Sequence, residues 1–164
     1  MKSVIFPVAS LLVGVSQPAL AYCYPDVDDS VRGEFRRSDI VAIVRAERVR
    51  WLDENRRPTK LKKPLALGNM PGGFDPYVGA YYTVRLIRAF KGNPPTHFLI
   101  FSENTEARTP LRMRRPLLLF ITRSKINDEY QRAGDLLVDY CGNSALASKA
   151  TNEVRLVSRL AARR

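Results

Sequence analysis

The sequence predicts a mainly β domain of five strands, with a short helix before the strands and a second helix after them. The clearest signal is the segment 80–92, where apolar and polar residues alternate as in a strand with one face on a core. A second signal is the unbroken apolar run PLLLFIT at 116–122, which is typical of a buried strand. The chain of 164 residues is long enough for one domain with its own core.

Residues 1–21 have the pattern of a signal peptide. A short positive start precedes an apolar run, and Ala19 and Ala21 stand at the two positions that a signal peptidase reads. Cleavage after Ala21 is therefore expected, and residues 22–164 form the single predicted domain. This predicts a periplasmic or secreted protein.

Two alternatives to a cleaved leader remain. A transmembrane anchor would need a longer apolar run to span about 30 Å of hydrocarbon, and no stop-transfer charges follow this one. A lipoprotein would carry its acyl group on Cys23, but the bulky Tyr22 is a poor fit to the position before an acylated cysteine. After removal of the leader, no long apolar segment remains, so we expect no transmembrane span.

The two cysteines, Cys23 and Cys141, are expected to pair, because cysteines outside the reducing cytoplasm more often form disulfides than stay free. A bridge closing more than a hundred residues would stabilise the fold by roughly 4–5 kcal/mol in the chain-entropy model. Two unrelated thiols, one of them reactive, are the alternative.

The first helix is expected over Pro25–Arg37, where apolar residues recur every four positions, although Gly33 weakens this prediction. Its start is acidic and its end is basic, as the helix dipole favours. The acidic cluster could be offered as a metal site, but first-turn carboxylates explain it better. The residues of that cluster are Asp26, Asp28 and Asp29.

The strands follow in order. Ile40–Val49 is expected first, and the irregular segment 50–80 after it has the length of a functional loop. The 80–92 strand, with an irregularity near Ile87, forms a hairpin with Thr96–Phe101 through a connection rich in Gly, Asn and Pro. Pro116–Thr122 and Asp135–Tyr140 complete the predicted strands, and the last of them delivers Cys141. Thr151–Arg163 is predicted as an amphipathic helix with arginines opposite its apolar stripe.

No catalytic signature is present. The sequence contains no H-E-x-x-H, G-x-S-x-G or C-x-x-C motif and no glycine loop of the kind that holds phosphates. The single histidine, His97, stands at a predicted strand start, where a structural role is favoured over catalysis. A zinc site needs three or four ligands, which the sequence does not supply in a cluster. We expect a protein without enzymatic activity, metal or cofactor, and a cryptic hydrolase is the least favoured reading.

One helix, five strands and a second helix, with a cysteine near each end, is the plan of a small OB-like barrel. Four segments make the suggestion more specific: SDIVAIV at 38–44, VRLIRAFKG at 84–92, LLLF at 117–120 and the late cysteine at 141. In these segments the chain resembles the netrin-like domain, also called tissue-inhibitor-of-metalloproteinase-like, in its small bacterial secreted form. The resemblance covers most of residues 22–164, and each of its motifs is short.

The resemblance implies an OB fold and a disulfide between Cys23 and Cys141 that holds the N-terminus to the barrel. It also implies an alternative function, inhibition of a metalloprotease through the N-terminal segment. In the animal inhibitors the first residue of the mature protein is a cysteine that chelates the protease zinc. Cleavage after Ala21 would instead leave Tyr22 first.

Positive charge is the strongest functional feature. The formal net charge is +11, and arginine outnumbers lysine 20 to 7. We therefore expect an exported binding module that recognises a protein or an anionic envelope component through basic loops. Binding of single-stranded nucleic acid by stacking and phosphate contacts fits the fold but not the exported location. Genomic base composition is the alternative source of the arginines. The candidate binding residues are Arg45, Arg48, Arg50, Trp51, Arg56, Arg57, Lys60, Lys62, Lys63, Arg112, Arg114 and Arg115.

Overall fold

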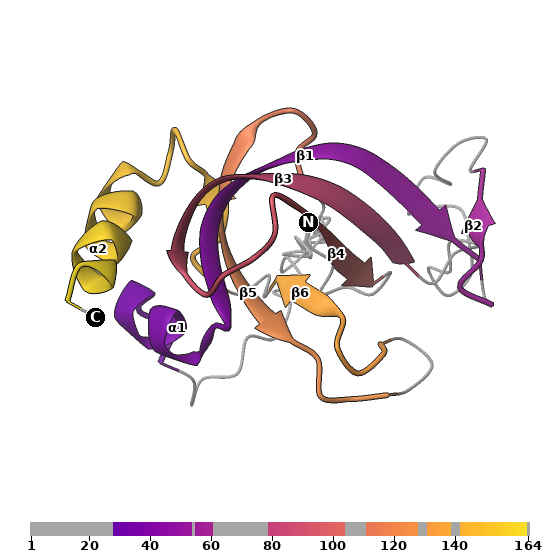
Figure 1. Cartoon of the computed structure of the whole chain (residues 1–164), viewed down its shortest axis with the longest axis horizontal. Helices are drawn as coiled ribbons and strands as arrows, with labels where there is room; N and C mark the ends of the chain where they lie inside the picture. The colour runs from indigo at the N-terminus through magenta and orange to yellow at the C-terminus, as the bar shows by residue number, and fades with distance from the viewer. Residues whose placement is uncertain are drawn as a thin grey trace, which may run out of the picture.

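The structure is a computed structural model that describes residues 28–53, 55–60, 79–103, 111–127, 131–138 and 142–163. Its centre is a closed five-stranded barrel, and two helices lie together at one end of the molecule (Figure 1). The mainly β, OB-like fold expected from the sequence is confirmed.

Five strands form the barrel. They are β1 (Ile40–Leu52), β3 (Gly79–Lys91), β4 (His97–Glu103), β5 (Pro116–Arg123) and β6 (Leu136–Val138). Their order is β1-β3-β4-β6-β5, and pairing of β5 back onto β1 closes the barrel. All pairings between them are antiparallel except that of β4 with β6. Two short strands that the sequence did not predict extend the sheet, β2 (Pro58–Thr59) beside β1 and β7 (Ala145–Leu146) beside β5.

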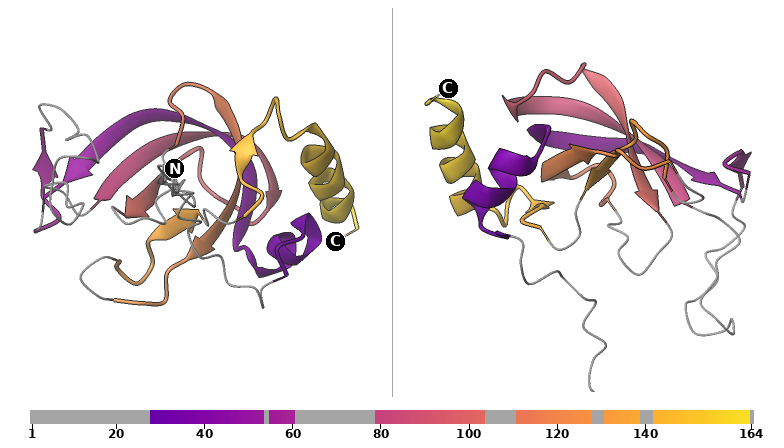
Figure 2. Two further views of the ribbon diagram at one scale, coloured as in Figure 1. Left: turned by 180° about the vertical axis from the view of Figure 1, so that it is seen from behind. Right: turned by 90° about the horizontal axis from the view of Figure 1, so that it is seen from below.

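The two longest strands, β1 and β3, bend strongly as they pass around the barrel (Figure 2). Residues inserted on one strand without a partner on the other permit this bending. Ile43 pairs with Arg88 and Val44 pairs with Leu86, so that Ile87 is such an extra residue. The irregularity predicted near Ile87 is therefore confirmed.

The core has two parts. Side chains that point into the barrel form the first, among them Val44, Ile100 and Leu119. The second lies between the barrel and the helices, where Phe35, Phe120 and Val157 pack together. Because β1 and β5 are buried on both faces where they meet the helices, their apolar runs are continuous rather than alternating.

The first helix, α1 (Val31–Arg37), begins later than the predicted Pro25. Ser30 has an extended backbone and its Oγ accepts a hydrogen bond from the Gly33 amide at 3.1 Å, so Ser30 is the N-cap. Asp28 and Asp29 consequently precede the helix and do not lie in its first turn, which corrects the prediction. Residues 25–27 lie outside the described part of the chain.

The remaining boundaries differ by a few residues. β1 continues to Leu52 and so includes Trp51, which was expected to open a loop. The second helix, α2 (Thr151–Ala161), ends two residues before the predicted Arg163. The predicted signal peptide, both cysteines and Lys62 and Lys63 lie outside the described residues. No helix in the described ranges is long and apolar enough to cross a membrane.

Candidate functional site

The turn that carries Arg112, Arg114 and Arg115 lies against the middle of β1. The Arg114 amide donates a hydrogen bond to the Ala46 carbonyl at 2.7 Å, and Met113 forms a bridge with Ala46. Arg114 adopts a left-handed backbone, with φ of 59°, which turns the chain into β5. The fold thus joins two basic segments that are far apart in the sequence, one on β1 and one before β5.

Seven of the predicted residues have exposed side chains, and we call this set the basic loop surface. Arg48 and Arg50 belong to the stretch of β1 whose neighbours Val49 and Trp51 pack against the core, so the two arginines face outward. Arg45 is half-buried beside Pro116 of β5. The basic loop surface consists of Arg48, Arg50, Arg57, Lys60, Arg112, Arg114 and Arg115.

Neither the candidate Trp51 nor the nearby Tyr82 lies on this surface as an exposed platform. Trp51 is half-buried and packs against the barrel core, and Tyr82 is buried in that core. Base stacking would need exposed ring faces. Neither ring is placed to offer one.

Arg56 is also placed differently from the other arginines, because its side chain is only 7 % exposed. Its Nη2 lies 2.8 Å from Asp135 Oδ2 and donates to the Tyr81 hydroxyl at 2.8 Å. The Tyr81 hydroxyl donates to Asp135 Oδ1 at 2.8 Å, which closes a triangle of polar groups. The guanidinium also lies over the Phe101 ring, 4.3 Å from its centroid.

These four residues form what we call the arginine clasp: Arg56, Tyr81, Phe101 and Asp135. It fastens the β1–β2 turn to β3, β4 and the start of β6. Burial of the hydroxyl, together with its bond to the Asp135 carboxylate, raises the pKa of Tyr81 above the usual 10.0. The clasp is a structural contact, and Arg56 does not contribute to the exposed basic loop surface.

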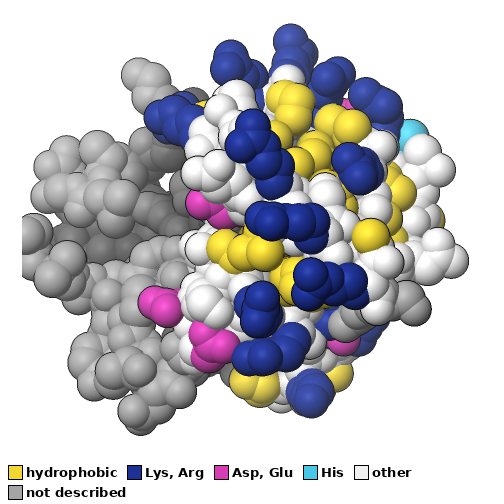
Figure 3. All heavy atoms as spheres, turned by 90° about the vertical axis from the view of Figure 1, so that its left-hand side faces the viewer, with side chains coloured by type: hydrophobic (Ala, Val, Ile, Leu, Met, Phe, Trp, Pro, Cys, Tyr) yellow, Lys and Arg dark blue, Asp and Glu magenta, His cyan; other side chains and the backbone are white. Residues whose placement is uncertain are grey.

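A second basic surface, which the sequence analysis did not single out, covers the end of the molecule where α1 and α2 lie together. Figure 3 shows Lys and Arg side chains spread across this end, with apolar side chains between them and few acidic ones. Arg88 joins it because the end of β3 packs against α2. This helix-end face consists of the exposed residues Arg32, Arg36, Arg37, Arg88, Lys149, Arg155, Arg159 and Arg163.

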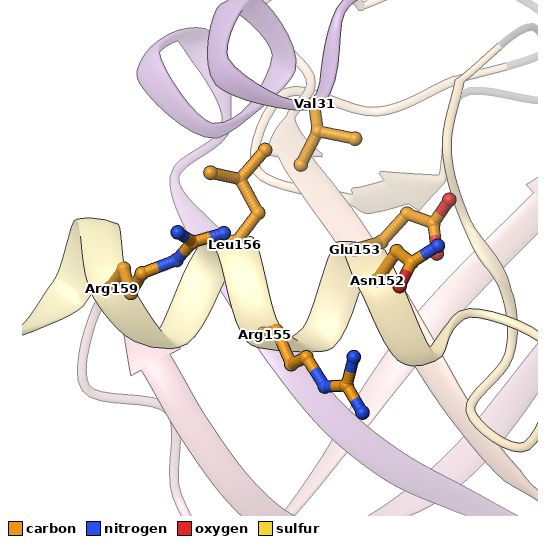
Figure 4. Close-up of a pocket in the computed structure, with 6 residues that line it drawn as sticks. All are labelled: Val31, Asn152, Glu153, Arg155, Leu156 and Arg159. Carbon is orange, nitrogen blue, oxygen red and sulfur yellow. The ribbon is translucent and has the colours of Figure 1, made fainter.

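A groove of about 330 Å³ runs between the two helices of this face. Val31 and Leu156 point toward one another across it, whereas Arg155 points away from α1 (Figure 4). Glu153, Asn152 and Arg159 complete its lining. The groove therefore combines an apolar floor with charged walls.

A buried carboxylate anchors α1 to the segment after β6. Glu34 is 2 % exposed, and its Oε2 accepts hydrogen bonds from the backbone and side-chain nitrogens of Asn143, at 2.6 and 2.8 Å. The Asn143 side chain also donates to the Asp29 carbonyl at 2.7 Å. These contacts bring together two segments that each follow a cysteine in the sequence.

His97 begins β4, and its side chain is 53 % exposed, 3.6 Å from the Glu47 carboxylate. Glu47 also pairs with Arg85 at 3.0 Å. Within the described ranges, no three His, Cys, Asp or Glu side chains gather in a group that could hold a metal ion. The segment that the inhibitor alternative requires, residues 22–27, lies outside those ranges.

Comparison with models of known protein families and with curated proteins found no match.

Proposed function

We propose that this chain is an exported, non-enzymatic binding module that recognises an acidic protein or another anionic envelope component through the basic loop surface. The observation that carries the proposal is the contact of Arg114 with Ala46, which joins two separate arginine-rich segments. Summed positive charge raises the local concentration of an acidic partner and speeds its association. The resemblance to netrin-like domains, whose fold presents loops on a rigid barrel, supports the same view.

Three arginines of this surface are suited to a test, because their side chains are exposed and make no hydrogen bond or ion pair within the described residues. These are Arg48, Arg112 and Arg115. Their replacement by glutamine removes charge without removing a structural contact. We call this set of substitutions the loop triple variant.

The test is capture of a partner from the protein's own envelope fraction after removal of its lipids, at low and high ionic strength. We expect capture at low salt, loss of capture at high salt, and a strong reduction in the loop triple variant because the attraction is screened or removed. The matched control is a helix triple variant, Arg32→Gln, Arg155→Gln and Arg159→Gln, which loses the same number of positive charges from the helix-end face. Equal capture by the wild type and the loop triple variant would refute the assignment.

A further inference from the structure

The helix-end face differs from the basic loop surface in its construction. α2 carries Arg155 and Arg159 four residues apart, so that they form a row along one side of the helix, and Arg163 lies two residues beyond the helix end. Successive members of such a row are about 6 Å apart along the helix axis. Arg32 is exposed on α1, directly after Val31, which lines the same groove as Arg159.

The arginines of this row are free to bind a ligand. The side chains of Arg32, Arg155 and Arg159 make no hydrogen bond or ion pair with any other described residue. Arg36, by contrast, pairs with Asp28 at 2.9 Å, and Arg37 donates to the Asp28 carbonyl. The planar guanidinium matches the oxygens of phosphate and carboxylate groups in two parallel hydrogen bonds, so an unpaired arginine row favours such anionic groups.

Apolar side chains accompany these charges. Leu156 and Val31 form the floor of the groove between the helices, and Ile87, next to Arg88, is 44 % exposed. Arginine can lay its aliphatic stem along apolar surface while its charged head reaches outward. Apolar groups between basic side chains are the composition of a surface that binds the interface of an anionic bilayer.

We propose that the helix-end face binds the phosphate groups of an anionic phospholipid bilayer and so holds the barrel against a membrane surface. The bilayer suits this face better than an acidic protein does, because charges spread over two helices and the end of β3, with apolar side chains between them, match an extended anionic interface. This inference is separate from the proposed function, since it uses a different set of arginines. The basic loop surface would remain available for its own partner.

The test uses the chain from Tyr22 onward, which keeps every described residue and lacks the apolar leader that would itself enter lipid. Binding is measured by cosedimentation with vesicles of phosphatidylcholine alone and of phosphatidylcholine mixed with phosphatidylglycerol. We expect binding to the mixed vesicles at low ionic strength and little binding to the neutral ones. Each basic residue near an anionic surface contributes roughly fivefold, so the helix triple variant should bind about a hundredfold more weakly.

The loop triple variant is the matched control, and it should retain most of the vesicle binding. Equal loss in both triple variants would mean that net charge alone causes binding and would overturn the assignment to this face. Absence of binding to mixed vesicles at low salt would also overturn it. Displacement of the protein from vesicles by soluble glycerol phosphate would show that the face binds small phosphate esters, and this would refute the proposal that it binds a bilayer.

If the helix-end face bound an acidic protein and not lipid, capture from a lipid-free fraction would depend on its arginines. Capture from a delipidated envelope fraction that fails only in the helix triple variant would assign the face to a protein and refute the lipid proposal. Loss of capture in the loop triple variant alone would bear on the proposed function. It would say nothing against vesicle binding by the helix-end face. The two proposals are therefore tested independently.

Discussion

Asp28 organises the turn that leads into α1. Its Oδ1 accepts a hydrogen bond from the Ser30 amide at 3.1 Å, and its Oδ2 pairs with Arg36. The hydrogen bonds from Ser30, and then the charges of Arg36 and Arg37, lower the pKa of Asp28 below 3.8. Between the lowered pKa and 3.8 the unfolded chain binds more protons than the folded one, so folding stability rises with pH there.

Replacement of Asp28 by Asn should therefore reduce the free energy of unfolding at neutral pH by a modest amount. The contribution of Asp28 is present above pH 3.8 and is lost as the pH falls through the lowered pKa. Denaturant titrations across the acid range should show the wild type and Asp28→Asn converging below pH 3.8. A difference that stays constant into strong acid would contradict this role of the carboxylate.

Gly33 stands inside α1 for a steric reason. A Cβ at this position would lie 2.3 Å from Asp28 Cγ and 2.5 Å from the Asp28 carbonyl oxygen. In an ordinary helix, Ala is favoured over Gly by about 1 kcal/mol. Here we expect Gly33→Ala to destabilise the protein by about 1–3 kcal/mol, because the turn must move.

Thermal or denaturant unfolding of Gly33→Ala checks this prediction. Asn152→Ala, at an exposed position of α2, is the control and should be neutral or slightly stabilising. An increase in stability in Gly33→Ala would show that Asp28 does not pack over the helix as described.

At the scale of elements, the arginine clasp joins the β1–β2 turn to the barrel. Arg56 and Asp135 are 7 % and 9 % exposed, so removal of either partner leaves the other buried without its counter-charge. We expect Arg56→Met and Asp135→Leu each to cost about 3 kcal/mol of unfolding free energy. The double variant should lose clearly less unfolding free energy than the sum of the losses in the two single variants.

A double-mutant cycle in denaturant measures this coupling. Arg57→Met is the control for the loss of an arginine in the same turn, since Arg57 is exposed, and it should change little. Additive losses in the cycle would contradict an energetic role for the pair.

The link between the two cysteines stays a prediction, but the neighbouring contacts favour it. Asn143, two residues after Cys141, bonds to the carbonyl of Asp29, six residues after Cys23. Six residues of extended chain span at most about 20 Å, so this contact is compatible with a bridge between the two cysteines. A bridge would fasten the N-terminal segment to the chain after β6.

Peptide mapping of the protein purified without reductant should recover a Cys23–Cys141 peptide. Replacement of both cysteines by Ser should lower the free energy of unfolding by about 2–5 kcal/mol. Alkylation of both thiols in the native, unreduced protein would rule out the bridge.

On the scale of the whole molecule, the sequence predicts elements better than it predicts their neighbours. The five barrel strands were recognisable because alternation and apolar runs depend on local burial, and Ile87 interrupts that alternation. The start of α1 was misplaced because Asp26, Asp28 and Asp29 imitate the acidic first turn of a helix. Only the contact between Ser30 and Gly33 identifies the N-cap.

The candidate surfaces were predicted in part. Basic segments are visible in the sequence, but the exposure of each side chain is not. The side chain of Arg56 is buried and that of Arg57 is exposed, because Arg56 has a left-handed backbone and its side chain pairs with Asp135, which is distant in the sequence. The helix-end face was missed because it depends on α1 and α2 lying side by side, although they stand at opposite ends of the described chain. Its signals in the sequence were the basic end of the first helix and the arginines at intervals of four in 155–163.

The central claim is that exposed arginines of the basic loop surface hold an anionic partner. Its most direct test is the amount of partner captured from a delipidated envelope fraction, across a series of salt concentrations, by the wild type, the loop triple variant and the helix triple variant. The account predicts capture that falls steeply with salt for the wild type and the helix triple variant, and weak capture at every salt concentration for the loop triple variant. Capture that is independent of salt, or equal in all three proteins, would contradict it.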